Sequence, residues 1–91
     1  MNQTAKHIIF SGRVQGVGFR YTSYNIARRY QLTGYVKNLP DGTVEMTAQG
    51  SDDKVSACIQ GINEYFENYI KDTTIEEIPL NSQYADFKIT F

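Results

Sequence analysis

The chain is 91 residues long, carries a formal net charge of −1 at pH 7 and contains one cysteine. This length fits one small domain, which we expect to span residues 1–91. No segment approaches the roughly 20 apolar residues of a membrane span, and no apolar leader segment is visible. A general nucleic-acid binder usually has a basic excess. We therefore expect a cytoplasmic protein with neither a membrane nor a nucleic-acid partner.

The first third of the chain predicts a strand, an irregular connection and a helix. Residues 6–11 have Ile8 and Phe10 on one face of a strand. Residues 12–19 contain three glycines and cannot continue a strand comfortably. Residues 20–31 are expected to form a helix, because apolar and small side chains recur near them at helical spacing: Phe19, Ser23, Ile26, Ala27 and Tyr30.

The middle of the chain predicts a β-hairpin. Residues 34–38 form its first strand, and the Leu-Pro-Asp-Gly sequence at 39–42 is typical of a turn. Residues 43–49 alternate cleanly, so one face of the second strand should be buried and the other wet. Because the connection is short, these two strands should be antiparallel.

The last part of the chain predicts a second helix and two strands. The helix begins after cap candidates Ser51, Asp52 and Asp53, and its apolar stripe comprises Val55, Cys58, Ile59, Ile62 and Phe66. Strands follow at 73–78 and 86–91, the latter with Phe87, Ile89 and Phe91 directed inward. The expected fold is α+β: a ferredoxin-like two-layer α/β sandwich of β-α-β-β-α-β order, with an extra C-terminal strand and an antiparallel sheet.

The segment at residues 12–20, GRVQGVGFR, is the strongest functional signal. Its glycines let backbone N–H groups converge, and the following helix N-terminus favours an anion. Arg20 can pair with phosphate oxygens through its planar guanidinium, and no Asp or Glu occurs in residues 1–40. This pattern favours a phosphoryl site, although glycines alone also suit a tight connection.

Two other glycine motifs do not fit this segment. A Walker A loop starting at Gly12 needs glycine where Val17 stands, and no Lys-Ser/Thr pair follows. A dinucleotide-binding fingerprint starting at Gly16 needs its third glycine where Tyr21 stands. The sequence therefore gives no support to nucleotide binding.

The GRVQGVGFR segment, followed by GYVKN at 34–38 and GTVE at 42–45, resembles the acylphosphatase family. The resemblance runs from about Phe10 to Gly50 and returns in the ending FKITF. It implies an acylphosphatase-like domain that hydrolyses the carboxyl-phosphate bond of acyl phosphates. It further implies a small-molecule acyl phosphate as the partner, with inorganic phosphate or sulfate as product-like ligands.

The resemblance also assigns roles to residues. It implies that Arg20 and Asn38 are catalytic, with Arg20 gripping the phosphoryl group and Asn38 holding the attacking water. Thr43 would support Asn38. Backbone amides would cradle the phosphate at Arg13, Val14, Gln15, Gly16, Val17, Gly18, Phe19 and Arg20.

We expect no cofactor and no metal, because the Cys, His and carboxylate residues lack metal-ligand spacing. His7 is expected to be an ordinary strand residue and Cys58 a core residue. Asp52 and Asp53 suit a helix cap better than a metal site. The Arg13 side chain could contact substrate or be a solvated loop cation. The expected assembly state is a monomer, although the sequence does not itself define it.

The resemblance weakens over residues 51–85, and residues 67–71 lack the Gly, Ser or Pro that many family members have after the second helix. Tyr65, Phe66, Tyr69 and Ile70 could extend that helix, cover an edge or form a partner surface. One alternative function is a phosphate- or carbamoyl-phosphate-binding module of a larger maturation protein. Another is an RNA-binding domain, which the absence of aromatics on the outward face of residues 43–49 disfavours.

Overall fold

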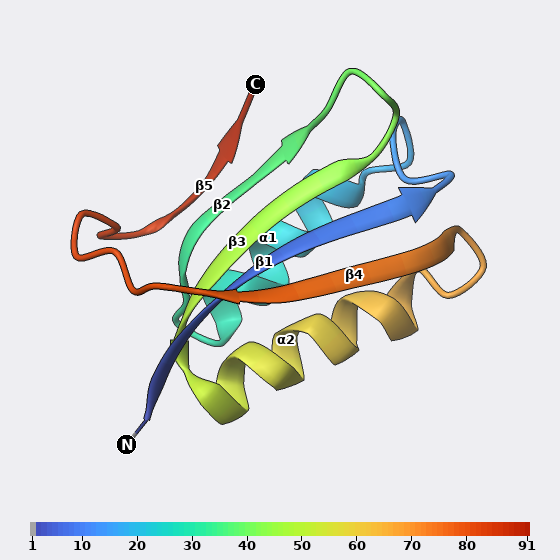
Figure 1. Cartoon of the computed structure of the whole chain (residues 1–91). Coiled ribbons are helices and arrows are strands. Elements are labelled where there is room, and N and C mark those ends of the chain that lie inside the picture. The colour runs from blue at the N-terminus through green and yellow to red at the C-terminus, as the bar shows by residue number, and fades with distance from the viewer. Residues whose placement is uncertain (1) are drawn as a thin grey trace.

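The computed structural model describes residues 2–91, so Met1 of the expected domain lies outside it. In chain order its elements are β1 (Gln3–Gly12), α1 (Phe19–Arg29), β2 (Thr33–Asn38), β3 (Val44–Ser51), α2 (Asp52–Tyr65), β4 (Ile70–Ile78) and β5 (Phe87–Thr90). The strands form one sheet in the order β4-β1-β3-β2-β5 (Figure 1). The two helices pack against each other and against one face of this sheet. The ferredoxin-like two-layer sandwich is therefore confirmed.

The sheet is mixed, which corrects the prediction of an antiparallel sheet. β4, β1, β3 and β2 pair antiparallel, but β5 pairs parallel with β2. The chain leaves β4 and crosses to the opposite edge of the sheet before β5 begins (Figure 1). Because β4 ends at the end of the sheet where β2 begins, β5 starts there too and must run alongside β2 in the same direction.

Several element boundaries differ from the predicted ones, most of all those of β1, β4 and α1. β1 and β4 are longer than expected, since they pair from Ala5 with Ile78 to Gly12 with Ile70. The helix predicted over 20–31 ends at Arg29. Gln31 has a φ of 60°, and the Leu32 amide donates a hydrogen bond to the Ala27 carbonyl oxygen. This left-handed turn ends the helix.

The core lies between the sheet and the helices and contains the residues of β1, β3 and α2 that were predicted to be buried. Ile8, Phe10, Val44 and Met46 of the sheet are fully buried against the helix stripes. The outward face of β3 is less exposed to solvent than predicted, because Thr47 is buried between its cross-strand neighbours His7 and Tyr35. A one-residue shift in strand pairing would move the apolar side chains to the polar face of the sheet. This cost fixes the register of the central strands.

Candidate active site

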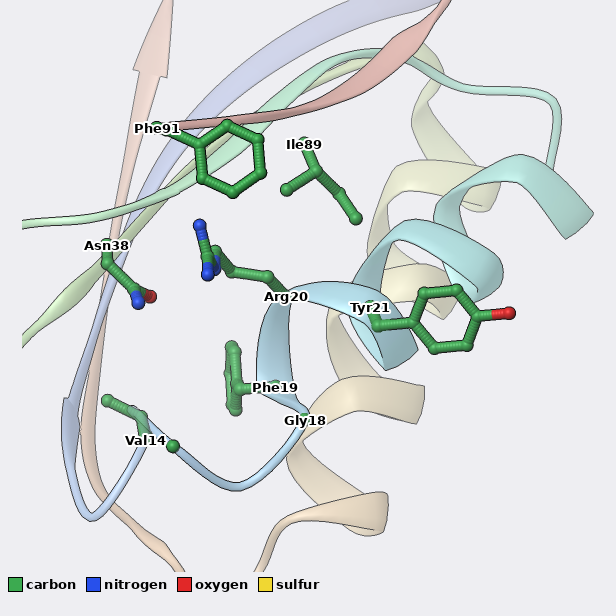
Figure 2. A pocket seen from close by; sticks show the side chains of 9 residues that line it. Val14, Gly18, Phe19, Arg20, Tyr21, Asn38, Ile89 and Phe91 are labelled. Carbon is green, nitrogen blue, oxygen red and sulfur yellow. The ribbon is translucent and has the colours of Figure 1, made fainter.

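The C-terminal ends of β1, β2 and β5 meet at one end of the sheet, because these strands run in the same direction. The N-terminus of α1 lies at this end as well (Figure 2). Here a cavity of about 250 Å³ is lined by Val14, Gly16, Gly18, Phe19, Arg20, Tyr21, Asn38, Ile89 and Phe91. Among these described residues Arg20 is the one charged side chain. The cavity is thus small and positively charged.

The connection between β1 and α1 turns at Gly16 and Gly18, whose φ angles are 79° and 77°. A side chain at either position would be strained in this left-handed region by roughly 1–2 kcal/mol. Such a turn lets successive amides converge on one anion. The backbone path around the cavity therefore favours glycine at Gly16 and Gly18, two of the three glycines in this segment.

The N-terminus of α1 adds further donors. Gly18 is the N-cap and offers no side-chain cap, and the Thr22 amide makes the first helical bond, 3.1 Å from the Gly18 carbonyl oxygen. The preceding amides have no helical acceptor. No acidic residue occupies the first turn, so the positive end of the helix dipole is not neutralised there.

The Arg13 amide is an exception within the predicted cradle. It donates to the Tyr69 carbonyl oxygen at 2.8 Å, and a backbone amide has one hydrogen to give. The Arg13 side chain lies over the ring of Tyr69, with Cζ 5.5 Å from its centroid. We therefore correct the candidate cradle to residues 14–20, and Arg13 is an exposed loop cation outside the cavity lining.

Arg20 is held over the cavity by the last strand of the sheet. Its Nη1 donates to the Thr90 carbonyl oxygen at 3.3 Å, and its Cζ lies 4.9 Å from the centroid of the Phe91 ring. Figure 2 shows the guanidinium between this ring and Asn38. Phe91 was predicted to point into the core, but 94% of it is exposed. Its ring covers the arginine instead, because the strand ends at the rim of the cavity.

Asn38 is the last residue of β2, and its amide points toward Arg20 (Figure 2). Its Oδ1 is buried and has no hydrogen-bond partner among residues 2–91. An unsatisfied buried acceptor typically costs about 1–3 kcal/mol. An incoming O–H or N–H donor, such as a water molecule, would satisfy it. The two predicted catalytic residues are therefore brought to the same cavity.

Thr43 lies in the β2–β3 turn, next to the Val44 that pairs with Asn38, and does not line the cavity. Its hydroxyl donates to Asp41 Oδ1 at 2.6 Å and its amide to the same oxygen at 3.0 Å. The hydroxyl bond, with the amide bond second, lowers the pKa of the Asp41 carboxyl. Thr43 thus braces the turn that follows Asn38, and the structure gives it no hydrogen bond to the Asn38 side chain.

The side chain of Gln15 makes a connection that the sequence reasoning missed. Its Nε2 donates to the carbonyl oxygens of Leu39, at 2.8 Å, and Thr43, at 2.9 Å. It therefore ties the glycine-rich loop to the β2–β3 turn. The sequence carried no local signal of this, since the partners are 24 and 28 residues away.

The remaining candidates lie outside the cavity. His7 lies on the outer face of the sheet, where its Nε2 is 2.9 Å from Glu45 Oε2. Cys58 is fully buried, as predicted, and burial raises the pKa of its thiol to about 12. Asp52 and Asp53 occupy the first turn of α2 after N-cap Ser51.

Metal-ligand clusters and membrane-spanning helices are both absent from residues 2–91. No group of three or more His, Cys, Asp or Glu side chains in this range is placed to hold a metal ion. No helix of the described chain is long and apolar enough to cross a bilayer.

Fold and cavity together define a ferredoxin-like sandwich with a small pocket, lined by Arg20 and Asn38, at one end of its sheet. A sequence model of the family described as Acylphosphatase matches residues 6–89. The chain belongs to the acylphosphatase family, a family of enzymes.

Relatives and solved structures agree with this assignment. An acylphosphatase from Bifidobacterium longum is 51% identical over 65% of this chain and 61% of its own length. One from Marinobacter nauticus is 38% identical over 92% of both chains. The crystal structure of acylphosphatase from Bacillus subtilis has a TM-score of 0.88 and 31% identity, covering 97% of this chain and 99% of that one.

A larger protein contains a similar unit. Full-length HypF, solved in a phosphate- and nucleotide-bound form, matches 99% of this chain with a TM-score of 0.88 and 33% identity. The match covers 12% of the HypF chain. Similar folds thus occur both in a small acylphosphatase, at 31% identity, and as part of a longer chain, at 33% identity.

Proposed function

We propose that this protein hydrolyses acyl phosphates to a carboxylate and inorganic phosphate. The observation that carries the proposal is the convergence of Arg20, Asn38 and the helix N-terminus on one small cavity. Arg20 and the amides of residues 14–20 bind the phosphoryl oxygens. Their positive potential stabilises charge on those oxygens in the transition state.

Asn38 orients the attacking water. Its buried Oδ1 accepts a hydrogen bond from the water, which then attacks phosphorus opposite the leaving oxygen. The bond from phosphorus to the acyl oxygen breaks, the carboxylate leaves with the bonding electron pair, and the water proton passes to a phosphate oxygen. A carboxylic acid has a pKa of about 4, so its anion leaves without a general acid. Positioning and charge stabilisation therefore suffice.

Benzoyl phosphate hydrolysis in the presence of a chelator tests the proposal. We expect turnover by the unaltered protein, competitive inhibition by inorganic phosphate or sulfate, and loss of nearly all turnover in Arg20→Ala with the fold intact by circular dichroism. Turnover in Arg20→Ala within about tenfold of the parent would overturn the role of Arg20, because removal of one such donor typically lowers kcat by a factor of about 10²–10³.

A second candidate function is a phosphate- or carbamoyl-phosphate-binding module; the match to part of HypF, solved with phosphate and nucleotide bound, supports phosphate binding. The same assay separates the two, since a binding module would bind phosphate without turning over benzoyl phosphate.

We also propose that the protein acts in the cytoplasm as a monomer. Analytical ultracentrifugation at micromolar concentration tests the monomer.

A further inference from the structure

A second hollow lies on the outer face of the sheet, the face that the helices do not cover. It has a volume of about 220 Å³ and lies between β2, β5 and the segment 79–86, which crosses from β4 to β5 (Figure 1). We call it the outer pocket; the side chains that line it include Tyr35, Gln83, Tyr84, Asp86, Lys88 and Thr90. Its lining shares no residue with that of the cavity at Arg20, so the two hollows are separate.

The segment that walls the outer pocket is fixed to the sheet at both of its ends. At its start, the Gln49 side chain donates to the Asn81 carbonyl oxygen at 3.0 Å and accepts from the Asn81 amide at 2.7 Å. At its end, the Gly34 amide donates to the Asp86 carbonyl oxygen at 3.0 Å. The outer pocket therefore exists before any ligand arrives, which lowers the entropic cost of binding.

Two tyrosines give the outer pocket its aromatic surface. The rings of Tyr35 and Tyr84 lie with their centroids 6.4 Å apart and their planes inclined by 62°. The Tyr35 hydroxyl donates to Glu45 Oε1 at 3.1 Å, which holds this ring in place. Both tyrosines are half-buried, so each keeps a surface that a further flat ring can cover. Aromatic pairs of this kind favour a third ring as a neighbour.

One carboxylate and one ammonium group line the same pocket. Asp86 lies immediately before β5 and Lys88 lies within it, and both side chains are exposed. Neither forms an ion pair with another side chain of residues 2–91. A ligand that carries both an ammonium and a carboxylate group can pair with both residues, whereas a ligand with a single charge meets one group of its own sign.

Thr90 connects the outer pocket to the cavity at Arg20. Thr90 lines the outer pocket, and its carbonyl oxygen accepts the hydrogen bond from Arg20 Nη1 at 3.3 Å. β5 has four residues and pairs with β2 alone, at the edge of the sheet. A molecule bound between Tyr84 and β5 therefore restrains the strand that positions Arg20.

We propose that the outer pocket binds a small aromatic zwitterion, a free aromatic amino acid, and that its occupancy favours phosphate binding at Arg20. The ring packs against Tyr35 and Tyr84, the ammonium group pairs with Asp86, and the carboxylate pairs with Lys88. The binding site stands by itself, whereas the coupling to Arg20 rests on the proposed function. Because coupling between two sites is reciprocal, phosphate must raise the affinity for the amino acid by the same factor.

The first test titrates the isotopically labelled protein with L-phenylalanine and follows the amide signals of residues 83–88 by NMR. We expect a dissociation constant of about 1–10 mM, since the ligand is small. N-acetyl-L-phenylalanine lacks the ammonium group and L-phenylalaninamide lacks the carboxylate, so each should bind about two- to fivefold more weakly. The absence of saturable shifts in residues 83–88 overturns the site, and equal affinities for the three compounds overturn the zwitterion as its ligand.

Variants place the ligand within the outer pocket. Tyr84→Ala should weaken L-phenylalanine binding about two- to tenfold, and Lys88→Gln about two- to fivefold. Tyr65→Ala and Lys71→Gln are the matched controls, because both residues are exposed and neither borders the outer pocket. Parent-like binding in Tyr84→Ala and Lys88→Gln, or equal losses in the controls, overturns the site.

Saturating inorganic phosphate tests the coupling and separates the two hollows. We expect phosphate to tighten L-phenylalanine binding about two- to fivefold, the worth of one hydrogen bond, and Arg20→Ala to abolish this gain while retaining binding. Weaker binding in phosphate would place the amino acid in the cavity at Arg20 and overturn the site. Unchanged affinity overturns the coupling alone. If phosphate itself shifts no signal in residues 14–20, the proposed function and the coupling fail together, and the binding site is judged by its own variants.

Discussion

The guanidinium of Arg20 lies against the ring of Phe91, with Cζ 4.9 Å from the ring centroid. The neighbouring Thr90 carbonyl oxygen accepts a hydrogen bond from the same guanidinium. The first helix thus carries the arginine, and the last strand, 70 residues later, fixes where its charge lies. This arrangement depends on β5 running parallel to β2, which brings its C-terminal end to the cavity.

Replacement of Phe91 by alanine should lower kcat/KM without lowering stability. Because 94% of Phe91 is exposed, its removal costs the core little, but Arg20 loses a cation–π contact. Such a contact at an exposed site is worth about 0.5–1 kcal/mol, so we expect a loss of about two- to fivefold. Steady-state kinetics and urea unfolding measure the two effects, and Phe91→Trp should retain activity. An equal loss in the alanine and tryptophan variants would contradict the stacking role.

Replacement of Arg20 by lysine should not preserve activity. Lysine keeps the charge but lacks the planar pair of donors that matches two phosphate oxygens. We expect kcat/KM to fall by about 10²–10³, close to the loss in alanine. Arg29→Lys on the same helix is the control, since Arg29 is exposed and does not border the cavity. A lysine variant within a few-fold of the parent would show that charge alone is sufficient.

Replacement of Asn38 by alanine should reduce kcat more than phosphate affinity. The variant removes the buried Oδ1 that we expect to hold the water and leaves Arg20 and the loop amides in place. The inhibition constant of inorganic phosphate reports binding, and single-turnover kinetics report chemistry. A normal kcat combined with weak phosphate inhibition would reassign Asn38 to phosphate binding.

Replacement of Gln15 by methionine should loosen the glycine-rich loop. Methionine has a similar length, but it cannot donate to the carbonyl oxygens of Leu39 and Thr43. We expect lower backbone NMR order parameters in residues 14–18 and weaker phosphate inhibition, with a small effect on global stability because Gln15 is exposed. Unchanged order parameters in this segment would show that the two hydrogen bonds do not restrain the loop.

The predictable part of this protein depends on short-range patterns. Alternation over 43–49 placed Val44 and Met46 in the core, and the spacing of Val55, Cys58 and Ile62 placed α2 on the sheet. β4 was only partly predicted because it is an edge strand with most residues exposed. It therefore lacks the apolar alternation that burial imposes on central strands.

The unpredicted features depend on contacts between distant segments. The glycine-rich loop and its resemblance drew attention to Arg20 and Asn38, but nothing local to Arg20 indicates that Thr90 and Phe91 hold it. Likewise, nothing in the sequence near Arg13 indicates that its amide donates to the Tyr69 carbonyl oxygen. These contacts arise only when the strand order and the direction of β5 are known.

The outer face of the sheet should make stability depend on pH through Glu45. The Glu45 carboxylate lies 2.9 Å from His7 Nε2 and accepts from the Tyr35 hydroxyl at 3.1 Å. The hydrogen bond with His7 is the largest influence and lowers the pKa of Glu45. Burial raises the pKa of Glu45, whereas the hydrogen bond from Tyr35 and the nearby charge of Lys37 lower it.

The sign of the effect follows from the lowered pKa. The folded state favours the ionised carboxylate, so its contribution is fully present above the ordinary value of 4.5 and is lost as pH falls through the lower folded pKa. We expect Glu45→Gln to lower the urea midpoint at pH 7 and the difference from the parent to shrink at a pH below the folded pKa of Glu45, where the carboxylate is protonated. Glu67→Gln, at an exposed residue in the turn after α2, should change neither midpoint. An equal difference at both pH values would show that Glu45 acts through packing rather than through its charge.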